Sequence, residues 1–231
     1  MFGLNTKKKG IASIPLVTLL DSKSVVAEQF RMIRSSIRFA EVDQKIKTLI
    51  ITSSGMSEGK SMCASNLAVV FAQAGSKVLL VDADFRRPTI HLTWSISNTK
   101  GLSDSLLHPE NSLSDYVKQS NVTDLDLLAS GSQPPNPSEL LETQRMKEVL
   151  DETASKYDLV IFDSPPLAMP TDSQILANRV DGTILVTRER KTKNQELKQA
   201  IDLLKKANAK VLGAIYNGKK ALRNYDYGYI S

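Results

Sequence analysis

The chain has 231 residues, which fits a single domain and leaves little room for a second. It has one cysteine, so it cannot form a disulfide within itself, and no apolar run reaches the roughly 18–20 residues of a membrane span. The net charge of +5 is unevenly spread, because the C-terminal region from Arg188 has an excess of basic residues larger than that of the whole chain.

The first element in the chain is a long helical pattern over Val25–Glu41, within an N-terminal helical segment of residues 1–45 that precedes the first core strand. Glu28, Arg31 and Arg34 recur there at every third position, so they fall on one face of the helix. Two interpretations are open, an exposed face with i,i+3 ion pairs or a contact between subunits.

Six short runs rich in Val, Ile and Leu then predict strands that are buried on both faces of a parallel sheet. Helical patterns lie between them, and the alternation predicts an α/β fold with a doubly wound, mostly parallel sheet and helices on both faces. Ligands of such sheets bind at the carboxyl ends of the strands. The predicted strands are Thr48–Thr52, Val78–Val81, Leu125–Leu128, Leu159–Phe162, Thr183–Val186 and Val211–Ile215, and the predicted helices are Ser61–Ala74, Ser138–Ser155 and Glu196–Ala207.

The first strand leads directly into a glycine-containing loop that opens a helix, which is the context of a phosphate-binding loop. Backbone N–H groups of such a loop point at phosphate oxygens, Lys60 would neutralise the β and γ phosphates, and Ser61 would ligate Mg²⁺. The common pattern G-x-x-x-x-G-K-[ST] has glycine where this chain has Ser54. The sequence therefore predicts binding of Mg-ATP in a P-loop NTPase fold, through Ser54, Gly55, Met56, Ser57, Glu58, Gly59, Lys60, Ser61 and Met62.

Cys63 lies two residues beyond the loop serine, within the apolar pattern of the following helix. A lone cysteine can be a nucleophile, but this setting predicts a small packed residue.

Two carboxylates, Asp82 and Asp84, follow the apolar run of the second strand and precede Arg86 and Arg87. One acid could hold a metal-bound water while the other accepts a proton, and the arginines could steady phosphate charge or pair with the acids. The catalytic candidates are therefore Asp82 and Asp84 together with Lys60. The alternative is a polar turn with local ion pairs.

Asp163 follows four apolar residues at the end of the fourth predicted strand, which is the Walker-B form. Such an acid reaches the Mg²⁺ coordination shell directly or through water, so the metal candidates are Ser61, Asp82 and Asp163. Asn217, at the end of the last strand, is predicted to contact the adenine.

The region from Arg188 to Ser231 carries eleven Lys or Arg residues against four Asp or Glu. A basic surface can attract nucleic acid, anionic lipid or an acidic partner, or be merely solvated. Nucleic acid is not expected, because no aromatic side chains interleave with the basic ones. The tail, residues 218–231, carries Tyr225, Tyr227 and Tyr229, which read either as a short edge strand or as flexible phosphate acceptors.

Taken together, these motifs resemble the cytoplasmic catalytic subunit of the bacterial tyrosine kinases, the type associated with exopolysaccharide and capsule synthesis. The likeness runs over nearly the whole chain. It rests on Glu58-Gly59-Lys60-Ser61, Asp82-x-Asp84-x-Arg86, Asp163-Ser164-Pro165-Pro166, Pro135-Asn136-Pro137-Ser138-Glu139-Leu140-Leu141 and the terminal tyrosines.

The resemblance implies ATP-dependent phosphorylation of the tail tyrosines in trans, between neighbours in a ring for which an octamer is one arrangement, and phosphorylation of other proteins. It implies ring contacts through Glu28, Arg31 and Arg34. It also implies a cytoplasmic protein that is recruited to the inner face of the membrane by a separate transmembrane activator with a cytoplasmic tail, and a cognate tyrosine phosphatase.

The loop departs from the family pattern, which usually has Pro-Gly where this chain has Met56 and Ser57. A positive φ at Ser57 would cost roughly 1–2 kcal/mol. Two rival functions stay open. A positioning ATPase of the same superfamily would carry an extra lysine at the position of Gly55, and a scaffold would use nucleotide only to set its oligomeric state. Gly55 and the terminal tyrosines favour the kinase.

Overall fold

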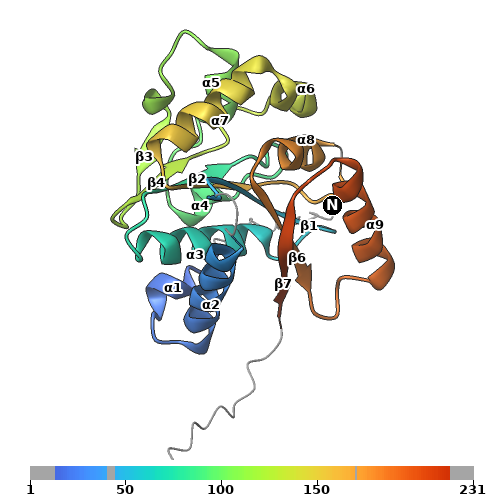
Figure 1. Ribbon diagram of the computed structural model, residues 1–231. Coiled ribbons are helices and arrows are strands. Elements are labelled where there is room, and N and C mark those ends of the chain that lie inside the picture. The colour runs from blue at the N-terminus through green and yellow to red at the C-terminus, as the bar shows by residue number, and fades with distance from the viewer. Residues whose placement is uncertain (1–13, 41–44, 170, 219–231) are drawn as a thin grey trace, which may run out of the picture.

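The structure is a computed structural model that describes residues 14–40, 45–169 and 171–218. A seven-stranded sheet with the order β3-β4-β2-β5-β1-β6-β7 forms its centre (Figure 1). All neighbouring strands are parallel except β3 and β4. The strands are β1 (Thr48–Ser53), β2 (Val78–Asp82), β3 (Val117–Gln119), β4 (Leu125–Leu128), β5 (Leu159–Asp163), β6 (Gly182–Arg188) and β7 (Val211–Asn217).

The six predicted strands are confirmed, and five of them extend one to three residues beyond the predicted bounds. The strand that the sequence does not predict is β3, which has three residues and pairs antiparallel to β4 at one edge of the sheet. It is only partly buried and its sequence, Val-Lys-Gln, has no apolar run. It therefore lacks the signal by which buried strands are found.

Helices cover both faces of the sheet, which confirms the predicted α/β class. Successive residues of β1 point to opposite faces: Leu49 and Ile51 belong to one core cluster and Ile50 to the other. The first face carries α1 (Val17–Leu20), α2 (Val25–Phe39), α3 (Lys60–Ala72) and α4 (Ile90–Thr93); the second carries α5 (Leu102–Leu107), η1 (Leu113–Asp115), α6 (Pro137–Glu142), α7 (Gln144–Lys156), α8 (Asp172–Arg179) and α9 (Asn194–Lys206) (Figure 1).

The prediction of one helix over Ser138–Ser155 is wrong, because the chain breaks at Thr143 into α6 and α7. Thr143 is extended, with φ −60° and ψ 157°. Its hydroxyl donates to the carbonyl of Leu140 at 2.8 Å and accepts from the N–H of Met146 at 3.2 Å. On one continuous helix Leu140 and Leu141 would face away from Met146 and Val149, so the apolar pattern changes phase at Thr143, a residue type favoured as a helix cap.

Basic side chains of α2 satisfy polar groups at the C-terminal end of α3. The guanidinium of Arg34 donates to the carbonyl of Val70 at 2.8 Å, in the last turn of α3, where carbonyls have no partner within the helix. Arg38 donates to the hydroxyl of Ser76 at 2.9 Å and lies over the ring of Phe71. These contacts fix α2 on α3 and hence on the sheet.

Cys63 is fully buried in α3, as predicted for a packed residue, and burial raises the pKa of its thiol to about 12.

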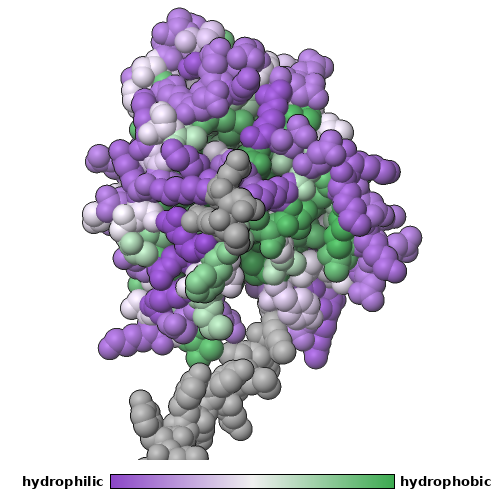
Figure 2. Space-filling view, in the orientation of Figure 1, coloured by the Kyte–Doolittle hydropathy of each residue, from purple (hydrophilic) through white to green (hydrophobic). Residues whose placement is uncertain are grey.

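Apolar side chains gather along β7, which is the outer strand of the sheet at that side (Figure 2). Within the described part of the chain, no helix combines the length and apolar character needed to cross a bilayer. The predicted acceptors Tyr225, Tyr227 and Tyr229 lie outside the described residues.

The cap between α6 and α7 gives a stability test. Thr143→Ala removes the hydroxyl that accepts the Met146 N–H, so we expect the free energy of unfolding to fall by about 1 kcal/mol in urea denaturation. Thr143→Ser keeps the cap and is expected to lose less than half of that. Equal stability of the alanine variant and the parent chain would show that the cap contributes nothing.

Candidate active site

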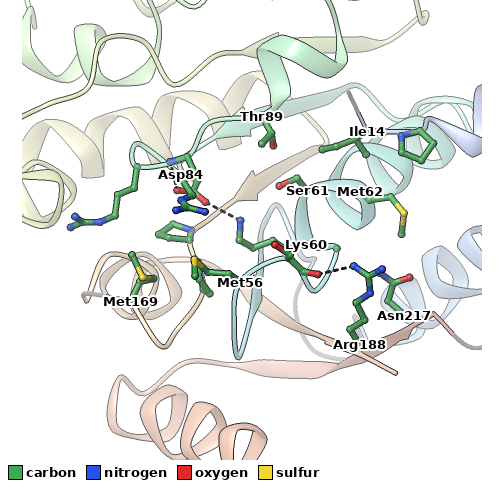
Figure 3. Close-up of a pocket in the computed structure, with 17 residues that line it drawn as sticks. Ile14, Met56, Lys60, Ser61, Met62, Asp84, Thr89, Met169, Arg188 and Asn217 are labelled. Carbon is green, nitrogen blue, oxygen red and sulfur yellow. Dashed lines mark hydrogen bonds and ion pairs between the residues drawn. The ribbon is translucent and has the colours of Figure 1, made fainter. Parts of the chain in front are cut away.

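The polar side chains of the site follow the order of the strands along one edge of the sheet. Asp82, at the end of β2, lies opposite Asp163, at the end of β5. The phosphate-binding loop follows β1, the next strand, and Arg188 and Asn217 are paired at the ends of β6 and β7. A cavity of about 640 Å³ opens over this edge, a volume within the usual range for small-molecule sites (Figure 3).

Two residues of the loop have left-handed backbone conformations. Gly59, which precedes α3, has φ +100°, and a Cβ there would lie 2.1 Å from the amide nitrogen of Asn217. Ser57 has φ +58°, so the positive φ anticipated at this position is present. A side chain in this conformation costs roughly 1–2 kcal/mol relative to glycine, so other contacts must hold Ser57 in place.

Glu58 points into the protein and is almost completely buried, with 1% of its surface exposed. Its carboxylate accepts hydrogen bonds from the hydroxyl of Ser54 at 2.9 Å, the N–H of Gly55 at 3.0 Å and the hydroxyl of Thr192. Ser54 therefore stands where the common pattern has glycine because its hydroxyl binds the loop's own glutamate.

Lys60 and Asp84 form an ion pair in the cavity, with 2.9 Å between Nζ and Oδ2 (Figure 3). Burial by itself lowers the pKa of Lys60, but the negative charges of Asp163 and Asp84 outweigh it and raise that pKa above its usual value. The other oxygen of Asp84 accepts the N–H of Arg87 at 3.0 Å. The predicted catalytic lysine and one predicted catalytic acid are thus in direct contact.

Asp163 is completely buried, and neither of its oxygens has a hydrogen-bond partner among the described residues. Burial raises the pKa of this carboxyl to about 6, although the charge of Lys60 and the hydroxyl of Ser61, which lies nearby without forming a well-aligned hydrogen bond, oppose the rise. A buried carboxylate without donors is costly unless a cation compensates it. The oxygen groups of Asp163 and Ser61 at this place suit Mg²⁺, which prefers oxygen ligands and keeps several waters.

Asp82 lies deeper and does not line the cavity. One oxygen accepts the N–H groups of Thr89 and Ile90, both at 3.0 Å, and the other accepts the N–H of Asp84 at 3.2 Å. Burial and the neighbouring Asp163 raise its pKa well above its usual value. These bonds hold the turn that presents Asp84 and the start of α4, while a metal or catalytic role for Asp82 stays a prediction.

Arg86, also predicted from the second motif, lines the cavity and pairs with the buried Asp172 at 2.9 Å. The same carboxylate accepts a hydrogen bond from Ser138. The motif around Asn136 and Ser138 is therefore linked to the end of β2 through the first turn of α8.

The sequence did not single out several residues that line the cavity. Arg188 lies two residues beyond the predicted strand Thr183–Val186 and ends the observed β6, so the rule that ligands bind at strand ends could have found it. Ile14 and Thr89 lie in segments without a recognisable pattern. Asn217 does line the cavity, as predicted, and its amide donates to the carbonyl of Glu58 at 2.9 Å. Its contact with adenine stays a prediction.

The chain is similar in sequence and fold to known proteins. A family model described as an AAA domain matches residues 47–214. The chain is 47% identical to tyrosine-protein kinase YwqD of Bacillus subtilis (strain 168) over 214 residues, which are 93% of this chain and 90% of that protein. The solved kinase domain of Escherichia coli tyrosine kinase ETK superimposes with a TM-score of 0.85 at 34% identity, covering 94% of this chain and 86% of that one.

The crystal structure of the chimerical protein CapA2B2 has a TM-score of 0.84 at 36% identity and covers 90% of this chain and 93% of that one. The fold shared with these structures is a P-loop fold, which implies that the loop binds a nucleotide.

Asp163 makes the stability of the nucleotide-free chain depend on pH. The pKa of its carboxyl is about 6 in the folded state, whereas the ordinary value is 3.8. Between these two pH values the folded state therefore binds more protons than the unfolded state. The free energy of unfolding therefore falls as pH rises through this window. Since one pKa unit is worth about 1.4 kcal/mol, we expect Asp163→Asn to raise the free energy of unfolding at pH 7.5 by up to about 3 kcal/mol.

Urea denaturation at pH 5 and pH 7.5, with EDTA and without nucleotide, measures this effect. The exposed Asp151→Asn is the matched control. Identical pH dependence in the parent chain and the Asp163 variant would contradict the assignment.

Proposed function

The chain belongs to the family of bacterial tyrosine-protein kinases, and we propose that it transfers the γ-phosphate of Mg-ATP to tyrosines in the tail of a neighbouring copy and to other proteins. The observation that carries the proposal is the contact of Lys60 with Asp84 beside the buried carboxylate of Asp163, which has no well-aligned hydrogen-bond donor among the described residues. A cation, a base and a metal ligand are the groups that phosphoryl transfer requires.

The nucleotide-binding residues are proposed to be those of the loop from Ser54 to Met62, with Lys60 on the β and γ phosphates and Asn217 near the adenine. Ser61 and Asp163 would hold Mg²⁺, with Asp82 behind them acting through water. When bound, the ion would neutralise charge on the phosphates. The residues of the chain position the phosphates and supply the positive charge, which is where most of the catalysis of such transfers arises.

Asp84 is proposed to accept the proton of the incoming tyrosine. In the structure its carboxylate is bound to Lys60, so the base becomes available when the phosphates draw Lys60 away. A bond then forms between the phenolic oxygen and the γ phosphorus, and the bond from that phosphorus to the β–γ bridging oxygen breaks. The phenolic proton passes to Asp84 and ADP leaves.

The acceptors are proposed to be Tyr225, Tyr227 and Tyr229 of an adjacent copy in a ring. The surface of α2 supports such a contact, because Val25, Met32 and Phe39 recur at intervals of seven and are 58%, 65% and 81% exposed. The exposed Glu28 pairs with Arg31 on this helix. Arg34 is less available for a contact between copies, because its guanidinium donates to the carbonyl of Val70 within the same chain.

We also propose that a separate transmembrane activator recruits the chain to the inner face of the membrane through its cytoplasmic tail, and that the kinase regulates exopolysaccharide or capsule synthesis. A cognate tyrosine phosphatase would reverse the modification. These statements rest on the resemblance and on the likeness to the CapA2B2 chimera.

The labelled-ATP experiment tests the proposal against both rivals. We expect the parent chain to incorporate label from γ-labelled ATP on tyrosine, and deletion of residues 225–231 to abolish it. Free phosphate without labelled protein would indicate a positioning ATPase, and neither product would indicate a scaffold. Lys60→Met should also abolish labelling, because Lys60 lines the cavity and is the cation proposed to neutralise the β and γ phosphates.

Asp84→Asn separates binding from transfer. Since a positioned base typically contributes about 10²–10⁴-fold, we expect the rate of transfer to fall at least ~100-fold while the dissociation constant for Mg-ATP changes little. Single-turnover kinetics and nucleotide titration measure the two quantities. Unchanged transfer in this variant would remove Asp84 as the base.

A further inference from the structure

The phosphate-binding loop is held from outside by the last residues of β6 and β7 and by the connection between these strands. Arg188, the last residue of β6, donates from its guanidinium to the carbonyl of Ser57 at 2.9 Å (Figure 3). Asn217, the last residue of β7, donates to the carbonyl of Glu58 at 2.9 Å. Thr192, from the connection between them, donates to the carboxylate of Glu58.

The hydroxyl of Thr192 is itself oriented by the backbone. Its oxygen accepts the N–H of Arg188 at 2.8 Å, and the N–H of Thr192 donates to the carbonyl of Arg188 at 3.0 Å. Since the oxygen is already an acceptor from Arg188, its proton is directed to Glu58. A hydroxyl fixed in this way is a donor of defined direction, unlike a freely rotating surface threonine.

The bond matters because of where Glu58 lies. Its carboxylate is buried and is served by side-chain and backbone donors of the loop on one side and by Thr192 on the other. Removing a donor from a buried charged acceptor costs more than an ordinary hydrogen bond, because the acceptor is left undersolvated. Loss of Thr192 would therefore shift Glu58, and with it the backbone of the loop.

The same loop contains Ser57 in its left-handed conformation, which persists only where surrounding contacts over-determine it. The contacts from Arg188, Thr192 and Asn217 fall on Ser57 and Glu58, the two residues before Gly59. A loop held in its binding shape loses less conformational freedom when the ligand arrives.

We propose that Thr192 is a positioning residue for the nucleotide: through Glu58 it keeps the loop's N–H groups in the arrangement that binds the phosphates. The inference rests on the nucleotide site proposed above and adds a residue that lies 134 positions from Glu58 in the chain. Thr192 itself does not line the cavity, so its effect passes through the loop.

Thr192→Val tests this, because it keeps the branched shape and removes the hydroxyl. We expect roughly tenfold weaker binding of a fluorescent ADP analogue in the presence of Mg²⁺, and a similar rise in KM for ATP with a smaller change in kcat. Thr192→Ser should restore most of the lost affinity. Thr123→Val is the matched control, since Thr123 is exposed in the turn before β4.

Unchanged affinity in Thr192→Val would overturn the proposal, as would an equal loss in Thr192→Ser and Thr192→Val. A lower melting temperature with normal affinity would assign Thr192 to stability alone and would also overturn it. If the valine variant does not fold, Thr192→Ala provides the same comparison. Failure of the parent chain to bind Mg-nucleotide would instead refute the nucleotide site itself, so the two failures are distinguishable.

Discussion

The site depends on one electrostatic constraint, three buried carboxylates that share a single nearby lysine. Asp82 and Asp163 end adjacent strands, Asp84 follows two residues later, and Lys60 opens the helix that faces them. Asp82 has backbone donors and Asp84 has Lys60, so among the described residues Asp163 is the acid of the three with the least complete compensation, which comes from the charge of Lys60 and the nearby hydroxyl of Ser61. Because a cation at this site would offset the buried negative charge, the proposed binding of metal with nucleotide would stabilise the folded chain.

This constraint follows from the topology of the sheet. Strands that are parallel and buried on both faces all end at one edge, so polar residues that follow separate apolar runs meet there. The interior offers these carboxylates few side-chain donors, so backbone N–H groups of the turns donate hydrogen bonds to them. Asp82 shows the result, because the acid that resembles a metal ligand in sequence also organises the turn leading to α4.

The same logic explains how much could be predicted from sequence. The buried strands, the loop, the Lys60–Asp84–Asp163 group and the cavity position of Asn217 each carry a local signal, either an apolar run or a motif at its end. The short edge strand β3 carries none, because it has three residues and no apolar run. The break at Thr143 carries a weak one, a change of phase between Leu141 and Met146 that the prediction of one continuous helix ignores. The partnership of Arg86 with Asp172 joins distant segments, so only the fold reveals it.

The departures of the loop from its usual pattern form one unit in three dimensions. Ser54, in place of glycine, donates its hydroxyl to Glu58. Ser57, also in place of glycine, has a strained positive φ, and its carbonyl accepts a hydrogen bond from Arg188. Read separately, each substitution suggests a weakened phosphate site. Together with the β6–β7 connection they describe a loop whose shape is fixed by its neighbours rather than by glycine. A chain with these loop residues but without the donors beyond β6 would leave Glu58 buried and incompletely solvated, so the loop and that connection are constrained to change together.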